Sequence, residues 1–225
     1  PDKKVLKQGA GAALINNPKL AQEIIRQTKK GAGSLPVSIK TRIGYDKYDK
    51  KEFKKWLTVL LEAKPAVITI HGRTKKEMSL VPAHWDIIAE AVKIRNKFDN
   101  SKNKTLILGN GDVKSVGDAE EKAKMSGVDG VMIGRAVFGN PWLFSESRPC
   151  QEPAKPVTVA GRLSTLLEHT KLFEKINKGK KFDVMKKHFK SYVAGFPGAK
   201  ELRIKLMAAK NTKEVEKIIK GYHRP

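Results

Sequence analysis

The sequence predicts an α/β fold, the second half of a TIM-type (βα)8 barrel, followed by a small all-α domain. Up to about residue 145, four short apolar runs alternate with amphipathic runs of helical period. After that point the strand-like runs stop, and polar residues gather where each apolar run ends. With 225 residues, 40% of them hydrophobic, the chain is long enough to bury such a core.

Four strands and four helices are expected to alternate in the first part of the chain. Strand-like runs cover residues 37–42, 66–71, 105–110 and 128–134, and helical patterns lie at about 17–30, 51–63, 84–97 and 115–126. Asn17 followed by Pro18 is typical of a helix start, and Ser115 or Asp118 is suited to cap the last of these helices. The alternation implies a parallel sheet, in a barrel or in a doubly wound fold.

Polar residues at the strand ends favour the barrel. The four expected strands end in the pairs Lys40 and Arg42, His71 and Arg73, Asn110 and Asp112, and Gly134 and Arg135. In (βα)8 barrels the active site forms at the C-terminal ends of the strands. We therefore expect these residues to face one site.

The second part of the chain is expected to be helical. Helical patterns cover residues 159–177, 182–194, 198–210 and 212–221, after a Pro-containing stretch that is typical of a linker. The predicted organisation is a barrel half at 1–148, a linker at 149–158 and a helical domain at 159–225.

The charge is strongly basic and unevenly distributed. The net charge is +23, and residues 151–225 hold 18 basic against 7 acidic residues, compared with 28 against 16 in residues 1–150. Such a tail attracts a polyanion such as a nucleic acid, although a lysine-rich soluble surface explains the charge equally simply.

Cysteine content and hydropathy exclude several classes of protein. Cys150 is the only cysteine and lies in the expected linker, so the chain forms no disulfide or zinc cluster of its own, as is typical of the reducing cytoplasm. No apolar run approaches the roughly 20 residues that span a bilayer. We expect neither a membrane nor a metal as a partner.

Two glycine-containing loops suggest a phosphate site. Residues 109–112 and the pair Gly134 and Arg135 follow the last two expected strands, where barrels commonly bind phosphate. Glycine allows backbone N–H groups to approach phosphate oxygens, and Arg135 adds a charged donor. The alternative is that the glycines only form tight turns.

Lys40 and His71 are the best candidates for contacts to a cofactor ring or substrate. A lysine at the end of a buried strand needs an electron-rich ligand or a structural carboxylate, because burying an unpaired ammonium is costly. His71 precedes Gly-Arg-Thr at the same edge and is suited to donate to a ring or carbonyl. A lone histidine is otherwise more often structural.

The helical tail contains cations interleaved with aromatic residues. Lys186, Lys187 and Lys190 lie near one face of an expected helix, and His188 and Tyr192 are one turn apart. This pattern suits RNA, although a solvated helix face explains it equally well.

These motifs together resemble the bacterial tRNA-dihydrouridine synthase family. The resemblance covers residues 109–112, 129–135 and 139–144, His71 with the Gly-Arg-Thr after it, residues 83–85, the opening segment 1–14, and the tail at 187–189 and 195–200. The combination is specific, although no single motif is.

The resemblance implies a barrel that reduces uridine in tRNA to 5,6-dihydrouridine. In the family NADPH reduces FMN, hydride passes to C6 of a flipped-out uracil, and a cysteine protonates C5. By position, Lys40 and His71 match residues near the flavin ring, and the residues that match the FMN phosphate site are Asn110, Gly111, Asp112, Gly134 and Arg135. The expected substrate and tRNA contacts are Arg42, Arg73, Lys186, Lys187, His188 and Lys190.

The chain departs from the family pattern at two places. The catalytic cysteine is expected just before Pro1. Within this chain, His71 is therefore the one residue expected to assist catalysis. The 225 residues alone are expected to be inactive. In the family, the stretch that corresponds to residues 75–80 commonly contains Gln and Tyr. This chain has other residues there, so the family's substrate contacts are not carried over to this stretch. We expect a monomeric full-length protein.

Two other functions stay open from the sequence. One is an FMN barrel oxidoreductase acting on a small molecule, and the other is a non-catalytic RNA-binding remnant. The basic helical tail favours tRNA, because an enzyme acting on a small molecule has no use for it.

Overall fold

The computed structural model describes residues 2–99, 101, 104–144 and 158–222. The chain divides into two compact units, Pro1–Gly134 and Arg135–Pro225.

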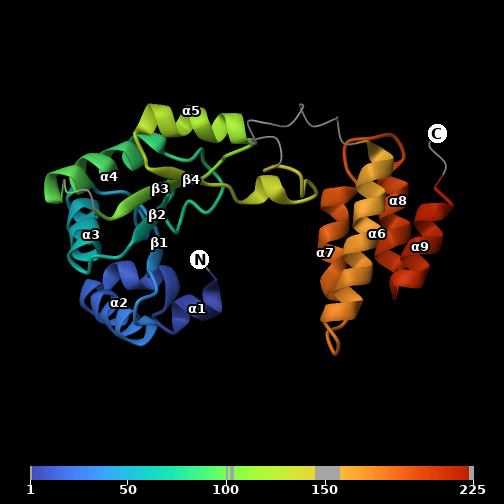
Figure 1. Cartoon of the computed structure of the whole chain (residues 1–225), viewed down its shortest axis with the longest axis horizontal. Coiled ribbons are helices and arrows are strands. Elements are labelled where there is room, and N and C mark those ends of the chain that lie inside the picture. The colour runs from blue at the N-terminus through green and yellow to red at the C-terminus, as the bar shows by residue number, and fades with distance from the viewer. Residues whose placement is uncertain (1, 100, 102–103, 145–157, 223–225) are drawn as a thin grey trace. The chain divides into compact units, whose positions relative to one another are not determined.

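The first unit is an α/β layer built on four parallel strands (Figure 1). The strands are β1 (Ser38–Arg42), β2 (Val67–His71), β3 (Leu106–Asn110) and β4 (Gly130–Met132), and they are hydrogen-bonded in the order β1-β2-β3-β4. The helices around them are α2 (Pro18–Ala32), α3 (Lys50–Glu62), α4 (Trp85–Phe98) and α5 (Val116–Ser126). The α/β class and all eight expected elements are confirmed. Among the described strands the order does not reverse, whereas a doubly wound sheet reverses it at its switch point.

The two faces of the sheet have different surroundings. Ile68, Ile70 and Ile107 are fully buried in one core with apolar residues of α2, α3 and α4. On the same face, the indole Nε1 of Trp56 donates to Thr41 Oγ1 at 3.0 Å. Because side chains alternate along a strand, the residues between these positions, including His71 at the end of β2, lie on the opposite face. The helices therefore cover one face, and the other presents the strand-end polar residues.

Local sequence signals explain the helix starts in this unit. Asn17 Oδ1 accepts from the backbone N–H of Leu20 at 3.2 Å and Pro18 is the first helical residue, as predicted. Ser115 Oγ caps α5 by accepting from Asp118 N at 3.0 Å. The short helix α1 (Lys3–Lys7) and the 3-10 helix η1 (Gly11–Asn16) were not anticipated in the opening segment.

The second unit is a helical bundle. It contains α6 (Val159–Ile176), α7 (Asp183–Tyr192), α8 (Ala199–Ala208) and α9 (Thr212–Lys220), and these four helices confirm the expected helical pattern. The residues that are fully buried at its centre include Leu166, Met185, Phe189, Val193, Leu206 and Val215.

The segment 135–144 packs with the helical bundle. It begins with the 3-10 helix η2 (Arg135–Val137), and Gly139 lies directly against the backbone of α7. A Cβ at Gly139 would come within 2.2 Å of the Ser191 carbonyl oxygen, and φ there is +75°. The structure thus divides the chain before Arg135, earlier than the boundary at 148 expected from the sequence. Of the expected linker only Thr158 is described, as the N-cap of α6, and Cys150 lies outside the described residues.

Candidate cofactor and substrate site

Four predicted residues meet at the C-terminal edge of the sheet. Arg42 of β1 is the register partner of His71 in β2, and His71 is the partner of Asn110 in β3. Lys40, two residues before Arg42, projects from the same face and its Nζ donates to Asn110 Oδ1 at 3.1 Å. Asn110 Nδ2 donates to the carbonyl oxygen of Met132 in β4 at 2.8 Å. The side chain of Asn110 thereby links three strands and holds Lys40 over the sheet.

Positive charge dominates this edge. Partial burial and the neighbouring Arg42 lower the pKa of Lys40. Burial, and then the charge of Arg73, lower the pKa of Arg42, and Glu77 only partly opposes this. Cations that destabilise one another in this way gain from an anionic or electron-rich ligand.

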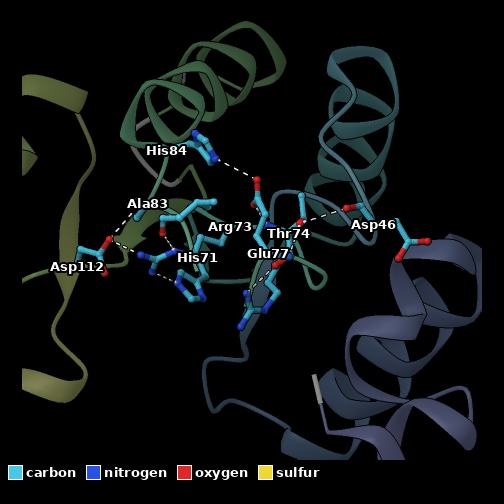
Figure 2. A network of polar contacts seen from close by, with 10 residues as sticks. Asp46, His71, Arg73, Thr74, Glu77, Ala83, His84 and Asp112 are labelled. Atoms are coloured by element: carbon cyan, nitrogen blue, oxygen red, sulfur yellow. Dashed lines mark hydrogen bonds and ion pairs between the residues drawn. The ribbon is translucent and has the colours of Figure 1, made fainter. Parts of the chain in front are cut away.

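Arg73 is enclosed by its own loop. Its side chain is buried, and its guanidinium forms an ion pair with Asp112 and donates through Nε to the Val81 carbonyl oxygen at 2.5 Å (Figure 2). Asp112 also accepts from the backbone N–H of Ala83 at 2.9 Å. A buried guanidinium requires such partners, because an unpaired charge is costly to desolvate. The structure thus pairs Arg73 with Asp112, and the direct substrate contact expected of Arg73 stays a prediction.

The loop after β2 holds a second set of polar contacts. Glu77 Oε2 accepts from the backbone N–H of Thr74 at 2.7 Å, and Glu77 Oε1 lies 3.2 Å from His84 Nε2 (Figure 2). Arg42 NH1 donates to the Thr74 carbonyl oxygen at 2.9 Å and so ties the loop to β1. Sequence reasoning missed Glu77 and assigned His84 only to a helix; the spacing of Thr74 and Glu77, which resembles a helix-capping pattern, was the available signal.

Packing explains two of the expected phosphate-loop glycines. A Cβ at Gly109 would lie 2.3 Å from the ring of Trp85, whose indole N–H donates to the Gly111 carbonyl oxygen at 3.0 Å. A Cβ at Gly111 would lie 2.6 Å from the Cβ of Ala83, and φ at Gly111 is +129°. At Gly134 the same position is open space. Close packing is therefore a sufficient reason for glycine at 109 and 111.

Gly134 and Arg135 fall on either side of the division between the units. Gly134 closes the first unit, and Arg135 opens the second as the first residue of η2. Their assignment to a phosphate site stays a prediction.

A basic groove lies between α7 and α8 of the helical unit. Its lining comprises the predicted residues Lys186, Lys187 and Lys190, together with Lys200, Arg203, Ile204 and Met207. Ile204 and Met207 are exposed, so the groove combines cations with apolar surface. The α8 residues were missed by sequence reasoning, although the spacing from position 200 to 203, 204 and 207 places them on one helical face.

His188 lies apart from the groove lining. Its ring centre is 5.0 Å from that of His169 in α6, and His169 Nδ1 lies 3.2 Å from the hydroxyl of Tyr192. Burial, and then the neighbouring His169 and Lys187, lower the pKa of His188. The ring of His188 therefore lies in a cluster of rings between two helices, and its expected RNA contact stays a prediction.

Membrane-spanning helices and metal-binding clusters are both absent from the described residues. No described helix is both long and apolar enough to cross a bilayer. Within the same part of the chain, no group of three His, Cys, Asp or Glu residues is arranged to hold a metal ion.

Known proteins match nearly the whole chain. The family description "Dihydrouridine synthase (Dus)" matches residues 1–222. A probable tRNA-dihydrouridine synthase of Staphylococcus aureus is 42% identical over 221 residues, which is 97% of this chain and 63% of that protein. A probable tRNA-dihydrouridine synthase 2 of Bacillus subtilis is 38% identical over 226 residues, covering 100% of this chain and 66% of that protein. The chain thus spans a little under two thirds of these relatives. It belongs to the dihydrouridine synthase family.

Proposed function

We propose that the protein containing this chain is a tRNA-dihydrouridine synthase, which uses FMN and NADPH to reduce uridine in tRNA to 5,6-dihydrouridine. The observation that carries the proposal is the row of Arg42, His71 and Asn110 on adjacent strands, with Lys40 held above it by Asn110. The relatives named tRNA-dihydrouridine synthases support the same assignment.

The chemistry of this row fits a flavin. Both polar ends of the Asn110 amide are engaged, one by Lys40 and one by the Met132 carbonyl oxygen, so Asn110 orients Lys40. An ammonium has three N–H donors, and one is used by Asn110, which leaves donors for the electron-rich pyrimidine edge of the ring. When bound, the flavin supplies hydride transfer from NADPH, and the protein supplies position and charge.

The phosphate end of the cofactor is assigned to the loops after β3 and β4. Residues Asn110, Gly111 and Asp112 contribute backbone to one loop, and Gly134 and Arg135 contribute to the other. The open space at Gly134 supports close approach of an oxygen there. The carboxylate of Asp112 serves this loop indirectly, by holding Arg73.

The proton for C5 of the uracil is assigned to the cysteine that precedes the position of Pro1 in the family pattern. Of the described residues, His71 lies beside Lys40 and Arg42 and assists by hydrogen bonding. Burial, and then the charges of Arg42 and Lys40, lower its pKa to about 4, so it is neutral at physiological pH.

The proposed architecture is a (βα)8 barrel followed by a tRNA-binding helical domain. Four parallel strands in sequential order, with helices on one face and polar residues at the C-terminal edge, support the barrel. The groove between α7 and α8 supports RNA binding, because its cations suit phosphates and its apolar residues suit sugars and bases. We propose a monomer that acts in the cytoplasm.

Flavin content and product analysis of the full-length protein test this function. The purified protein is expected to be yellow and, with NADPH, to form dihydrouridine in tRNA from a strain lacking the enzyme, measured by mass spectrometry. A yellow protein that leaves such tRNA unchanged but oxidises NADPH with a small molecule would indicate the other kind of flavin oxidoreductase. A colourless protein that binds tRNA would indicate an RNA-binding remnant.

A further inference from the structure

The ring of His71 has one fixed neighbour in the loop after β2. Arg73 NH1 lies 3.4 Å from His71 Nε2 in hydrogen-bonding geometry (Figure 2). The other guanidinium nitrogens are engaged by Val81 and Asp112, and the side chain of Arg73 is only 4% exposed. Arg73 therefore has one orientation available, and that orientation points a donor at Nε2.

This contact determines where the imidazole holds its proton. A guanidinium has five N–H donors and no acceptor, and it stays protonated in proteins. The nitrogen that faces Arg73 must accordingly accept, so Nε2 carries a lone pair. The single proton of a neutral ring is then on Nδ1. In water a free histidine prefers the opposite form, with the proton on Nε2.

The charges around the ring keep it neutral. Lys40 and Arg42 face it from β1 and Arg73 from its own loop, and the carboxylate of Asp112, from the loop after β3, opposes them. Burial and these cations lower the pKa of His71 to about 4. Protonation would also place an N–H against the Arg73 donor, so the charge and the hydrogen bond favour the same form.

We propose that Arg73 is a positioning residue that fixes His71 as the neutral Nδ1–H tautomer, so that His71 presents an N–H donor to an electron-rich acceptor of the bound ligand. This inference rests on the proposed function, since the flavin ring and the uracil supply such acceptors as carbonyl oxygens. Among the described residues, Nδ1 has no hydrogen-bond acceptor from the protein, which leaves its proton for a ligand. His71 then orients the ligand by donation and supplies no proton to the reaction.

Asp112 acts through Arg73 in this arrangement. Its carboxylate accepts from the guanidinium and from the backbone N–H of Ala83, so it fixes Arg73 relative to the loop. Gly111 lies near the same edge of the ring, since a Cβ there would lie 3.1 Å from Cδ2 and 3.4 Å from Nε2 of His71. The Nε2 edge of the imidazole is therefore packed close to both Gly111 and Arg73.

Nitrogen-15 NMR of the full-length protein labelled at histidine tests the tautomer directly. The His71 signals are identified by their loss in His71→Gln. We expect a protonated, pyrrole-like Nδ1 and an unprotonated, pyridine-like Nε2, unchanged from pH 8 to pH 5.5. A signal pattern with the proton on Nε2, or a doubly protonated ring at pH 6, would overturn the inference, whatever the variants below show.

Two substitutions separate the role of the guanidinium fork from that of its charge. In Arg73→Lys the positive charge stays but the donor aimed at Nε2 is lost, so His71 is expected to shift towards the Nε2–H form while remaining neutral. In Arg73→Met the same shift is expected together with a raised pKa of His71, because Asp112 then acts without its partner. Retention of the Nδ1–H form in both variants would show that Arg73 does not set it.

His84 provides an internal control for folding. It lies in the same loop but contacts Glu77, so its signals are expected to stay unchanged in both variants. Flavin content and dihydrouridine formation are measured on the same preparations. If His71 has its proton on Nδ1 but the protein is colourless and inactive, the tautomer is supported and the proposed function is contradicted. If His71 has its proton on Nε2 and the protein is yellow and active, only the proposed tautomer is contradicted.

Discussion

The Nζ of Lys40 lies 3.1 Å from Oδ1 of Asn110, although the two residues belong to strands separated by β2. The contact crosses the face of the sheet that the helices leave open. It shows how the first and third strands form one polar site at their C-terminal ends.

Removal of the Lys40 ammonium should weaken flavin binding. A hydrogen bond to a charged group contributes about 1.5–3 kcal/mol, so Lys40→Ala in the full-length protein is expected to raise the Kd of FMN roughly 10-fold to 100-fold. Fluorescence titration of the apoprotein with FMN measures this. Lys54→Ala, on the exposed side of α3, is the matched control and should leave the Kd unchanged. Equal Kd values for the wild type and Lys40→Ala would remove Lys40 from the site.

Gly109 should tolerate no side chain. A methyl group there would collide with Trp85, and overpacking of this kind costs about 1–3 kcal/mol. Thermal unfolding of Gly109→Ala is expected to show a clearly lowered Tm. Gly31→Ala, in α2 with open space around the new methyl group, is the control and should be neutral or slightly stabilising, because alanine is the better helix former. A Tm of Gly109→Ala equal to that of the control would mean that Trp85 does not pack against this strand.

His71 should make the folded state less stable in mild acid. Its pKa is about 4 in the folded protein and about 6.5 when unfolded, so between these values the unfolded state binds more protons. Its contribution is therefore constant above pH 6.5, and stability is lost as the pH falls towards 4. After allowance for solvent screening at this half-exposed ring, the expected loss is about 1–2 kcal/mol.

Urea unfolding at pH 7 and pH 5 measures this effect as a difference between the wild type and His71→Gln. The comparison cancels the contributions of His169 and His188, whose pKa values are also lowered by burial. The wild type should lose more stability than His71→Gln between the two pH values. An equal loss in both proteins would show that His71 titrates normally.

Removal of cations from the α7–α8 groove should weaken tRNA binding in a salt-dependent way. Replacement of Lys187, Lys190 and Lys200 by alanine is expected to lower the affinity of the full-length protein for tRNA. It should also reduce the slope of log K against log salt by about one for each tRNA phosphate that the variant no longer neutralises. Filter binding at several salt concentrations measures both quantities.

Lys213→Ala serves as the control for this groove, because Lys213 is exposed on α9 and outside the groove lining. It should change the affinity and the salt slope little. If the control weakens binding per charge as much as the groove substitutions do, the binding reflects overall charge and the groove has no special role.

Short-range patterns accounted for most of the fold. Each strand was recognisable as a short β-branched run, and Asn17-Pro18 and Ser115 gave helix starts that the structure confirms. Strand ends of a parallel sheet share one edge, so the grouping of Lys40, His71 and Asn110 followed from the same patterns.

Contacts between residues of distant loops could not be predicted from the sequence. Arg73 and Asp112 are 39 positions apart, and only their three-dimensional arrangement shows that they neutralise each other. Lys200 and Arg203 join the groove because α8 packs beside α7, and His188 faces His169 because α6 covers that side of α7. Local periodicity places residues on one face of a helix, but it does not show which helix packs beside that face.

Formation of dihydrouridine in tRNA tests the central claim most directly. The full-length wild type, incubated with NADPH and tRNA from a strain lacking the enzyme, is expected to form dihydrouridine detectable by mass spectrometry, and Lys40→Ala should form far less at the same FMN concentration. A wild-type protein that contains flavin but forms no dihydrouridine in that tRNA would contradict the account.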